Sequence, residues 1–365
     1  MFQKKYGLII ALLVLAIFAV GSVSAADDIA TDSVAQTDDT VADDIVIDDD
    51  DATVEEDVES QDVNNEQQNL RSPIEVEANS TSAQIQSIIN NANSGDTILF
   101  KSGQYDNPIY NISLKSNIIL DGNFVTLTGN SNDDIFLIYN CTGITIKNFV
   151  IDINGGKHGI YGSNVTNSIF DYNEITNGRD GININKFYDN LTITNNIFYD
   201  ISRDGISLVN NRVLFDADWA EVNESIISSN WIDGAEIGIF IGGNFKGLID
   251  NNIIENGDCG MVFQGKQSLN NGRLSATILN NEISAVDLGI NMTSPSVYFL
   301  NMTGNTIEVY DDYTEYAILN NTYFHKIINA IISVTGNELY GRISHGFNET
   351  CDEFNNTGHY FIDEN

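Results

Sequence analysis

A frame of asparagines and glycines repeats from about residue 120 to the C-terminus, and it constrains the fold more than any other feature. Each copy reads Asn-x-apolar, then a short polar turn, then Gly-apolar-x-apolar. Five of the eight steps between successive asparagines span 22 to 25 residues. The asparagines of the frame are Asn123, Asn148, Asn173, Asn196, Asn230, Asn252, Asn281, Asn305 and Asn337. A period of this length, filled with short strands and turns, indicates a solenoid.

The glycine half of the frame leads into short runs in which apolar and polar residues alternate. Its glycines are Gly159, Gly181, Gly205, Gly238, Gly260 and Gly289. Alternation is typical of strands that bury one face, and parallel strands stacked coil on coil bury the inward row. We therefore predict an all-β, right-handed parallel β-helix. The repeated asparagines have a structural explanation, because Asn tolerates left-handed turns and can form amide ladders between stacked strands.

Three regions of different composition are expected along the chain. Residues 1–26 have a basic start, an apolar core too short to span a bilayer and a small-residue cleavage pattern, which predict a signal peptide and export. Residues 27–70 hold 17 Asp or Glu and no Lys or Arg, which predicts a disordered acidic tether. Residues 71–365 are assigned to the β-helix domain, with no transmembrane anchor once the signal is removed. Eleven Asn-x-Ser/Thr sequons follow the signal and predict some glycosylation.

A short helix is expected at the start of the domain. Thr81 and Gln84 have the spacing of a capping box. Ile85, Ile88, Ile89 and Ala92 then follow at helical spacing, and Gly95 is the predicted end of the helix. Such an amphipathic helix would cover the open apolar end of the first coil.

The charge balance excludes several classes of partner. The chain has 16 basic and 52 acidic residues, a formal net charge of -36. Nucleic acid and anionic membranes are unsuitable partners, because both require clustered Lys and Arg. A neutral glycan, a cation or a basic partner remains open. The three cysteines, Cys141, Cys259 and Cys351, lie several coils apart in the frame, so unpaired thiols are predicted.

The two residues before each repeated glycine form a rim whose charge changes along the solenoid. Its N-terminal half is a patch of alternating sign, made of Lys157, His158, Arg179, Asp180, Arg203 and Asp204. One interpretation is a solvated turn with ion pairs that contribute little. The other is catalysis: a lyase needs a base such as Arg, Lys or His, and a hydrolase needs two carboxylates. Asp180 and Asp204 in adjacent coils would lie near 4.8 Å at the backbone, which fits both interpretations.

The C-terminal half of the rim is a file of carboxylates, namely Glu236, Asp258 and Asp287. Like charges one strand spacing apart repel, so either water screens them or a cation bridges them. Several flexible carboxylates together favour Ca²⁺, so the cofactor hypothesis is none or Ca²⁺.

Three coils are longer than the rest, and insertions in a solenoid become loops that often carry binding residues. The longer coils include Asn196–Asn230 and Asn305–Asn337. Their aromatic residues are candidates for stacking on sugar rings: Trp219, Tyr310, Tyr313 and Tyr316.

Together these features resemble the adhesin-like surface proteins of methanogenic archaea, within the pectate-lyase-like right-handed β-helix superfamily. The resemblance lies in the signal, the acidic tether, the segment Ala92–Ile98 and the Asn-x-Ile…Gly-Ile repeats. It implies the β-helix fold, whereas the superfamily contains lyases, hydrolases, epimerases and adhesins. Gly-His-Gly, Asn-Thr-Asp and Arg-Ile-Lys, typical of the superfamily's polygalacturonases, are absent. The leading hypothesis is therefore an extracellular or cell-surface protein that binds a polysaccharide, a glycoprotein or another cell surface without turnover. The alternative is a polysaccharide lyase or glycoside hydrolase acting through the rim patch, and the oligomeric state stays open.

Overall fold

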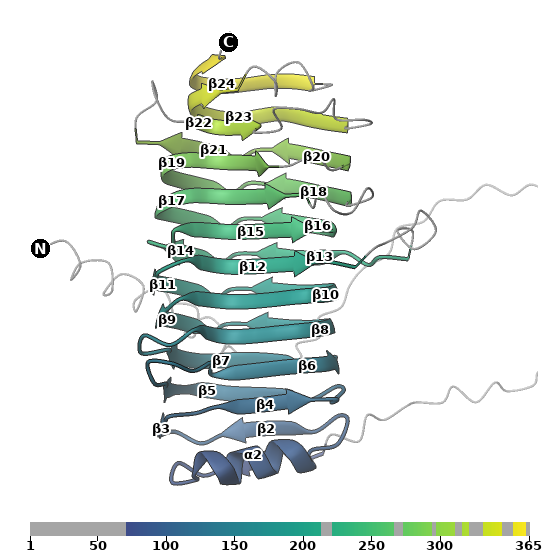
Figure 1. Ribbon diagram of the computed structural model, residues 1–365, viewed down its shortest axis with the longest axis vertical. Coiled ribbons are helices and arrows are strands. Elements are labelled where there is room, and N and C mark those ends of the chain that lie inside the picture. Colours follow the sequence, from purple (N-terminus) through teal and green to yellow (C-terminus); the bar gives the residue numbers. More distant parts are fainter. Residues whose placement is uncertain are drawn as a thin grey trace, which may run out of the picture. The chain divides into compact units, whose positions relative to one another are not determined.

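The chain forms a right-handed parallel β-helix, as the repeating frame predicts (Figure 1). The computed structural model describes residues 71–212, 221–265, 273–293, 297–310, 316–320, 331–344 and 353–362. These residues contain 24 strands in one continuous, all-parallel sheet and one helix. No helix in these ranges is long and apolar enough to cross a membrane. The signal peptide (1–26) and the acidic tether (27–70) lie outside the described residues and stay predictions.

Each coil contributes strands to three faces along the solenoid, and the longer strands turn from one face to the next. Face A contains β4 (Tyr110–Ser113), β6 (Phe136–Thr142), β12 (Asp204–Asn210), β15 (Ile237–Gly243) and β22 (Tyr316–Asn320). Face B contains β1 (Ile74–Val76), β2 (Thr97–Phe100), β13 (Ser225–Ser228), β16 (Phe245–Asp250), β18 (Arg273–Leu279) and β20 (Val297–Thr303). Face C contains β3 (Gln104–Asp106), β9 (Glu174–Gly178), β11 (Ile197–Ile201), β14 (Trp231–Asp233) and β21 (Thr306–Val309). The strands that span more than one face are β5 (Ile119–Thr128), β7 (Thr145–Asp152), β8 (His158–Asp171), β10 (Asp180–Thr194), β17 (Ile253–Gln264), β19 (Glu282–Thr293), β23 (Ile331–Ile343) and β24 (Glu353–Ile362).

The repeated glycines are required where one coil approaches the next. A Cβ atom added to Gly181 would lie 2.5 Å from the carbonyl oxygen of Gly205 and 2.4 Å from the ring of Phe198. At Gly238 the same atom would lie 2.6 Å from the carbonyl oxygen of Gly260. Gly181 lies within β10, and the isoleucines that follow it, Ile182 and Ile184, are fully buried in the core. The glycine frame therefore sets both the coil spacing and the register.

Stacked asparagines form a continuous ladder, buried except for its last member, Asn356, which confirms their structural role. Asn196 shows the pattern: its Nδ2 donates to Asn230 Oδ1 at 3.0 Å and to the carbonyl oxygen of Phe170 at 2.9 Å. The members are Asn173, Asn196, Asn230, Asn252, Asn281, Asn305, Asn337 and Asn356. Each side-chain amide thus satisfies groups of its neighbouring coils, as buried polar groups require.

The first two asparagines of the predicted frame lie outside this ladder. Asn123 and Asn148 adopt left-handed turns, with φ of 48° and 57°. Phe149 occupies the ladder position in its coil, because its neighbour Val150 pairs with Glu174, which follows Asn173. Asn123 and Asn148 therefore fit the predicted left-handed turns, whereas their placement in one column with the ladder asparagines was wrong. A left-handed Asn one residue earlier gives the same sequence pattern, and Asn356 was missed because its coil lacks the glycine half of the frame.

We expect the substitution Asn252→Asp to lower the free energy of unfolding by about 2–4 kcal/mol, because a buried carboxylate cannot replace an amide donor. Asn252 is fully buried, and its Nδ2 donates to Ile227 O and Asn281 Oδ1, both at 2.9 Å. Chemical denaturation measures the change. Asn132→Asp, at an exposed position, is the matched control. Equal stability of the two variants would contradict the ladder's role.

The helix α2 (Ser82–Asn91) lies across the N-terminal end of the coils, as expected (Figure 1). Thr81 and Gln84 form the predicted capping box. Ile85 and Ile89 are buried against the core. The helix ends at Asn91 and not at Gly95, whose φ of 89° belongs to the following turn. Among the cysteines, Cys141 and Cys259 are buried and unpaired, as predicted, while Cys351 lies outside the described residues.

Candidate functional site

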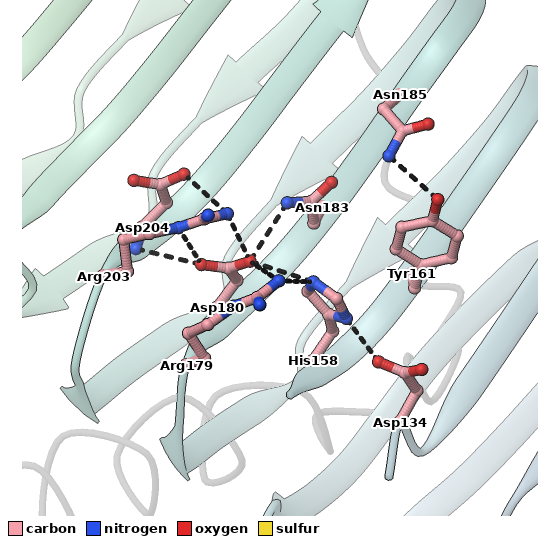
Figure 2. Close-up of polar contacts among 9 residues, drawn as sticks. All are labelled: Asp134, His158, Tyr161, Arg179, Asp180, Asn183, Asn185, Arg203 and Asp204. Atoms are coloured by element: carbon pink, nitrogen blue, oxygen red, sulfur yellow. Dashed lines mark hydrogen bonds and ion pairs between the residues drawn. The ribbon is translucent and has the colours of Figure 1, made fainter. Parts of the chain in front are cut away.

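Charged side chains from three adjacent coils meet where β8, β10 and β12 begin on face A (Figure 2). His158, Asp180 and Asp204 are the first residues of these strands, and Asp180 pairs with His158 in the sheet register. Arg179 and Arg203 precede two of them in the connecting turns. The structure thus brings together five of the six predicted rim residues, which we call the rim cluster together with Asp134.

Asp180 is the centre of the rim cluster and is fully buried. Arg203 binds its carboxylate with two hydrogen bonds, from Nε to Oδ1 at 2.7 Å and from Nη2 to Oδ2 at 2.6 Å. Asn183 Nδ2 donates to Oδ2 at 3.1 Å, and His158 Nε2 lies 3.0 Å from the same atom. Burial alone would raise the pKa of Asp180, but the hydrogen bond with His158 and the charges of Arg203, His158 and Arg179 outweigh it and lower the pKa. Asp180 is therefore an ionised anchor.

His158 is held between two carboxylates. Its Nδ1 contacts Asp134 Oδ1 and its Nε2 contacts Asp180 Oδ2. Burial would lower the pKa of His158, but the hydrogen bonds to Asp134 and Asp180 outweigh it and raise the pKa. Arg179 Nη2 also lies 2.7 Å from Nε2, but both nitrogens are donors when the ring is charged, so this contact is not a hydrogen bond of the imidazolium. Because both ring nitrogens face carboxylates, His158 is suited to carry a positive charge and is a poor general base.

Asp204 differs from Asp180 although the two lie in adjacent coils. It is 5% exposed, and its Oδ2 lies 3.3 Å from Arg203 Nη2. Burial raises the pKa of Asp204 to about 6, since the opposing charge of Arg203 is shared with Asp180. The rim cluster thus holds one carboxyl group with a lowered pKa and one with a raised pKa. Pairs of this kind are typical of acid–base sites, and structural ion networks can also produce them.

We expect Asp204→Asn to stabilise the fold at pH 8 by about 2–3 kcal/mol, since one unit of pKa shift corresponds to 1.36 kcal/mol. The folded pKa of about 6 exceeds the usual value of 3.8, so the favourable contribution of Asp204 is complete below pH 3.8 and is lost as the pH rises through 6. Thermal melts of parent and variant from pH 4 to pH 8 measure this gain. A pH-independent difference would contradict the raised pKa.

The sixth predicted rim residue, Lys157, is exposed and makes no side-chain contact with the rim cluster in the part of the chain that the structure describes. Asp134 takes its place on this side, through its contact with His158. The sequence did not reveal Asp134, because it lies in a turn without the glycine frame. The only sequence signal for Asp134 is that it is an acidic residue just before a face A strand.

The carboxylates proposed to bind calcium, Glu236, Asp258 and Asp287, are exposed. Within the described ranges, no group of three or more His, Cys, Asp or Glu side chains is placed to hold a metal ion. Calcium binding by these three carboxylates stays a prediction without geometric support.

The predicted aromatic residues are dispersed. Tyr310 is 58% exposed, and its hydroxyl donates to Asn256 Oδ1 at 2.8 Å. Tyr316 begins β22, and the guanidinium of Arg342 lies 4.9 Å from its ring centre. Trp219 and Tyr313 lie outside the described residues, and stacking by these side chains stays a prediction.

Two tyrosines that the sequence analysis did not select lie beside the rim cluster instead. The rings of Tyr139 and Tyr161 have centroids 6.0 Å apart, and the Tyr161 ring lies 5.0 Å from that of His158. Asn185 Nδ2 donates to the Tyr161 hydroxyl at 2.9 Å (Figure 2). Their outward positions in β6 and β8 are the signal that could have identified them.

Comparisons with known proteins extend to the fold only. No protein-family model and no curated protein matches the chain. Among solved structures, an alginate lyase from Paenibacillus sp. str. FPU-7 aligns with 70% of this chain and 99% of its own, at 15% identity and a TM-score of 0.43. A family 28 exopolygalacturonase from Yersinia enterocolitica aligns with 80% and 78%, at 12% identity and 0.46. PfbA, a surface adhesin of Streptococcus pneumoniae, aligns with 80% and 81%, at 13% identity and 0.41. At these values the likeness assigns neither an activity nor a ligand.

Proposed function

We propose that this is an exported polysaccharide-binding β-helix protein whose binding centre is the rim cluster on face A. Export rests on the predicted signal peptide. The centre differs from the sequence-based hypothesis, which placed glycan contacts on aromatic loop residues. Adhesion to a glycan-bearing surface is the corresponding biological role.

The observation that carries the proposal is the fixed pair of guanidiniums, Arg179 and Arg203. Both contact the buried Asp180 carboxylate, yet their side chains remain 46% and 40% exposed. Stability alone is a weak reason to bury such a network, because the cost of desolvating the charges offsets much of their attraction. Planar donors that are already held in place lose little entropy when they bind carbohydrate hydroxyl or carboxylate oxygens.

A glycan array followed by calorimetry with the purified protein tests this proposal. Arg179→Gln is expected to weaken binding at least tenfold, because it removes a fixed donor while Arg203 still neutralises Asp180. Arg71→Gln, whose guanidinium contacts Asp96 near the capping helix, is the matched control and should bind like the parent. The proposal fails if no glycan binds, or if both variants bind equally well.

Catalysis at the same site is the second candidate, and the raised pKa of the buried Asp204 carboxyl group favours it. Asp180 is enclosed by its partners and cannot act on a substrate, so the predicted Asp180–Asp204 pair is replaced by Asp204 and Glu236. Glu236 is exposed, lies one coil further along and is near enough to contribute to the raised pKa of Asp204 after the larger effect of burial. In this hydrolysis Asp204 protonates the glycosidic oxygen, Glu236 takes a proton from water, and the water oxygen bonds to the anomeric carbon as the glycosidic bond breaks.

Incubation with neutral and uronate polysaccharides, with and without Ca²⁺, tests for turnover. Hydrolysis releases reducing ends, whereas a lyase releases unsaturated products that absorb ultraviolet light. Hydrolysis that disappears in Asp204→Asn and has an acid dependence near pH 6 would support this candidate. If the protein binds the polysaccharide but neither assay detects a product, the non-catalytic role is supported.

A further inference from the structure

One buried hydrogen-bond acceptor beside the rim cluster is unpaired. Asn183 is 7% exposed, and its Nδ2 donates to Asp180 Oδ2. Its Oδ1 is buried and has no hydrogen-bond partner within the described part of the chain. Leaving a buried acceptor unpaired is costly, so each such atom in a folded protein requires an explanation. A hydroxyl group of a ligand would supply the missing donor.

The side chains around Asn183 form a surface suited to a sugar ring. In the sheet register Asn183 lies between Tyr161 of β8 and Ser207 of β12. Tyr161 is oriented from two sides, by the Asn185 amide at 2.9 Å and by the adjacent His158 ring. Tyr139 extends the aromatic surface by one coil towards the N-terminal end. Tyrosine rings provide large apolar contacts, and their fixed orientation limits the entropy lost on binding.

The charge at this position favours a neutral ligand. Asp134 contacts His158, whose ring lies 5.0 Å from that of Tyr161, so the Asp134 carboxylate is close to the aromatic pair. Burial, Tyr161 and the negative charge of Asp134 together raise the pKa of Tyr139. The cationic group nearest to the Asp134 carboxylate, His158, is already bound on both nitrogens by Asp134 and Asp180. A sugar carboxylate above the tyrosines would therefore lie beside the negative charge of Asp134, whereas the exposed guanidiniums of Arg179 and Arg203 lie on the other side of His158 (Figure 2).

We propose that Tyr139, Tyr161 and Asn183 form a subsite for a neutral, hydroxyl-bearing sugar unit next to the guanidiniums of the rim cluster. This inference rests on the proposed polysaccharide binding and adds the class of sugar. The ring lies against Tyr161, and one of its hydroxyls donates to Asn183 Oδ1. The polysaccharide then crosses successive coils of face A, from β6 towards β12.

Calorimetry with two sets of probes tests the subsite: neutral pentasaccharides of glucose, xylose or mannose, and oligogalacturonates. The parent is expected to bind at least one neutral probe. Tyr161→Ala should weaken that binding at least tenfold, whereas Tyr161→Phe keeps the ring and should stay within about threefold, in line with aromatic contacts that dominate recognition. Asn183→Ala should also weaken it, with melting curves showing that each variant is folded. Tyr310→Ala changes an exposed tyrosine elsewhere and should bind like the parent.

The outcomes separate this inference from the proposed function. Binding of oligogalacturonates alone, lost in Arg179→Gln but retained in Tyr161→Ala, would overturn the neutral subsite and keep the rim cluster as binding centre. Neutral binding lost in Tyr310→Ala but not in Tyr161→Ala would overturn both. Binding of no probe by the parent would also overturn both.

Discussion

Ile182→Asp should lower the free energy of unfolding by more than about 4 kcal/mol, enough to prevent stable folding of many domains. Ile182 is fully buried and pairs in register with Ile160 and Ile206 in the neighbouring coils. A carboxylate at this position would enter an apolar row without a cation or donor beside it. Circular dichroism and chemical denaturation would show an unfolded or strongly destabilised chain.

Ile182→Val provides the matched comparison, since removal of one buried methylene should cost only about 0.5–1.5 kcal/mol. Asn185→Asp places the same charge on the outward side of the same strand and should be tolerated far better, because Asn185 is partly exposed. If Ile182→Asp melted at the temperature of the parent, the inward and outward assignment of face A would be wrong.

The periodic part of the structure could be predicted because each coil repeats one physical problem. Gly205 and Gly238 recur where a Cβ atom would meet the next backbone, and Asn230 and Asn252 recur where a buried amide must pair in both directions. A pattern that repeats under such constraints predicts which strand residues point inward and where each coil begins. Asn is favoured both in left-handed turns and in the ladder. At Asn148 the sequence therefore cannot distinguish the two.

The candidate site could be predicted only in part, for a related reason. His158, Asp180 and Asp204 stand at equivalent places in the frame, so their proximity follows from the period. Their roles do not, because the burial of Asp180 depends on side chains from three coils. Asp134 was missed since it lies outside the frame. Asn183 and Tyr161 were missed because an outward polar or aromatic residue in a strand looks the same whether its partner is water, protein or ligand.

Asp180→Ala should lower the free energy of unfolding by about 3–5 kcal/mol at pH 6 and abolish polysaccharide binding, because removal of one partner leaves buried charges uncompensated. Arg203 would lose both of its hydrogen bonds to the Asp180 carboxylate, and His158 would lose one of its two carboxylates. Arg179 would lose its 3.3 Å contact with the same group. Both guanidiniums would then be free to move, so the donors would no longer be fixed for a ligand.

The pH dependence distinguishes this electrostatic role from loss of packing. The pKa of Asp180 is lowered below 3.8, so its stabilisation is present above that pH and is lost as the pH falls through the lower, folded value. Asp180→Asn keeps the shape of the side chain, and its deficit should therefore be largest above pH 3.8 and shrink as the pH falls below that value. Denaturation curves of parent, Asp180→Asn and Arg203→Ala on both sides of this pH would measure it. A loss of stability that does not change with pH would show that the Asp180–Arg203 contact does not hold the site together. The same conclusion would follow if the losses in the free energy of unfolding of the two single variants simply added in the double variant Asp180→Asn/Arg203→Ala.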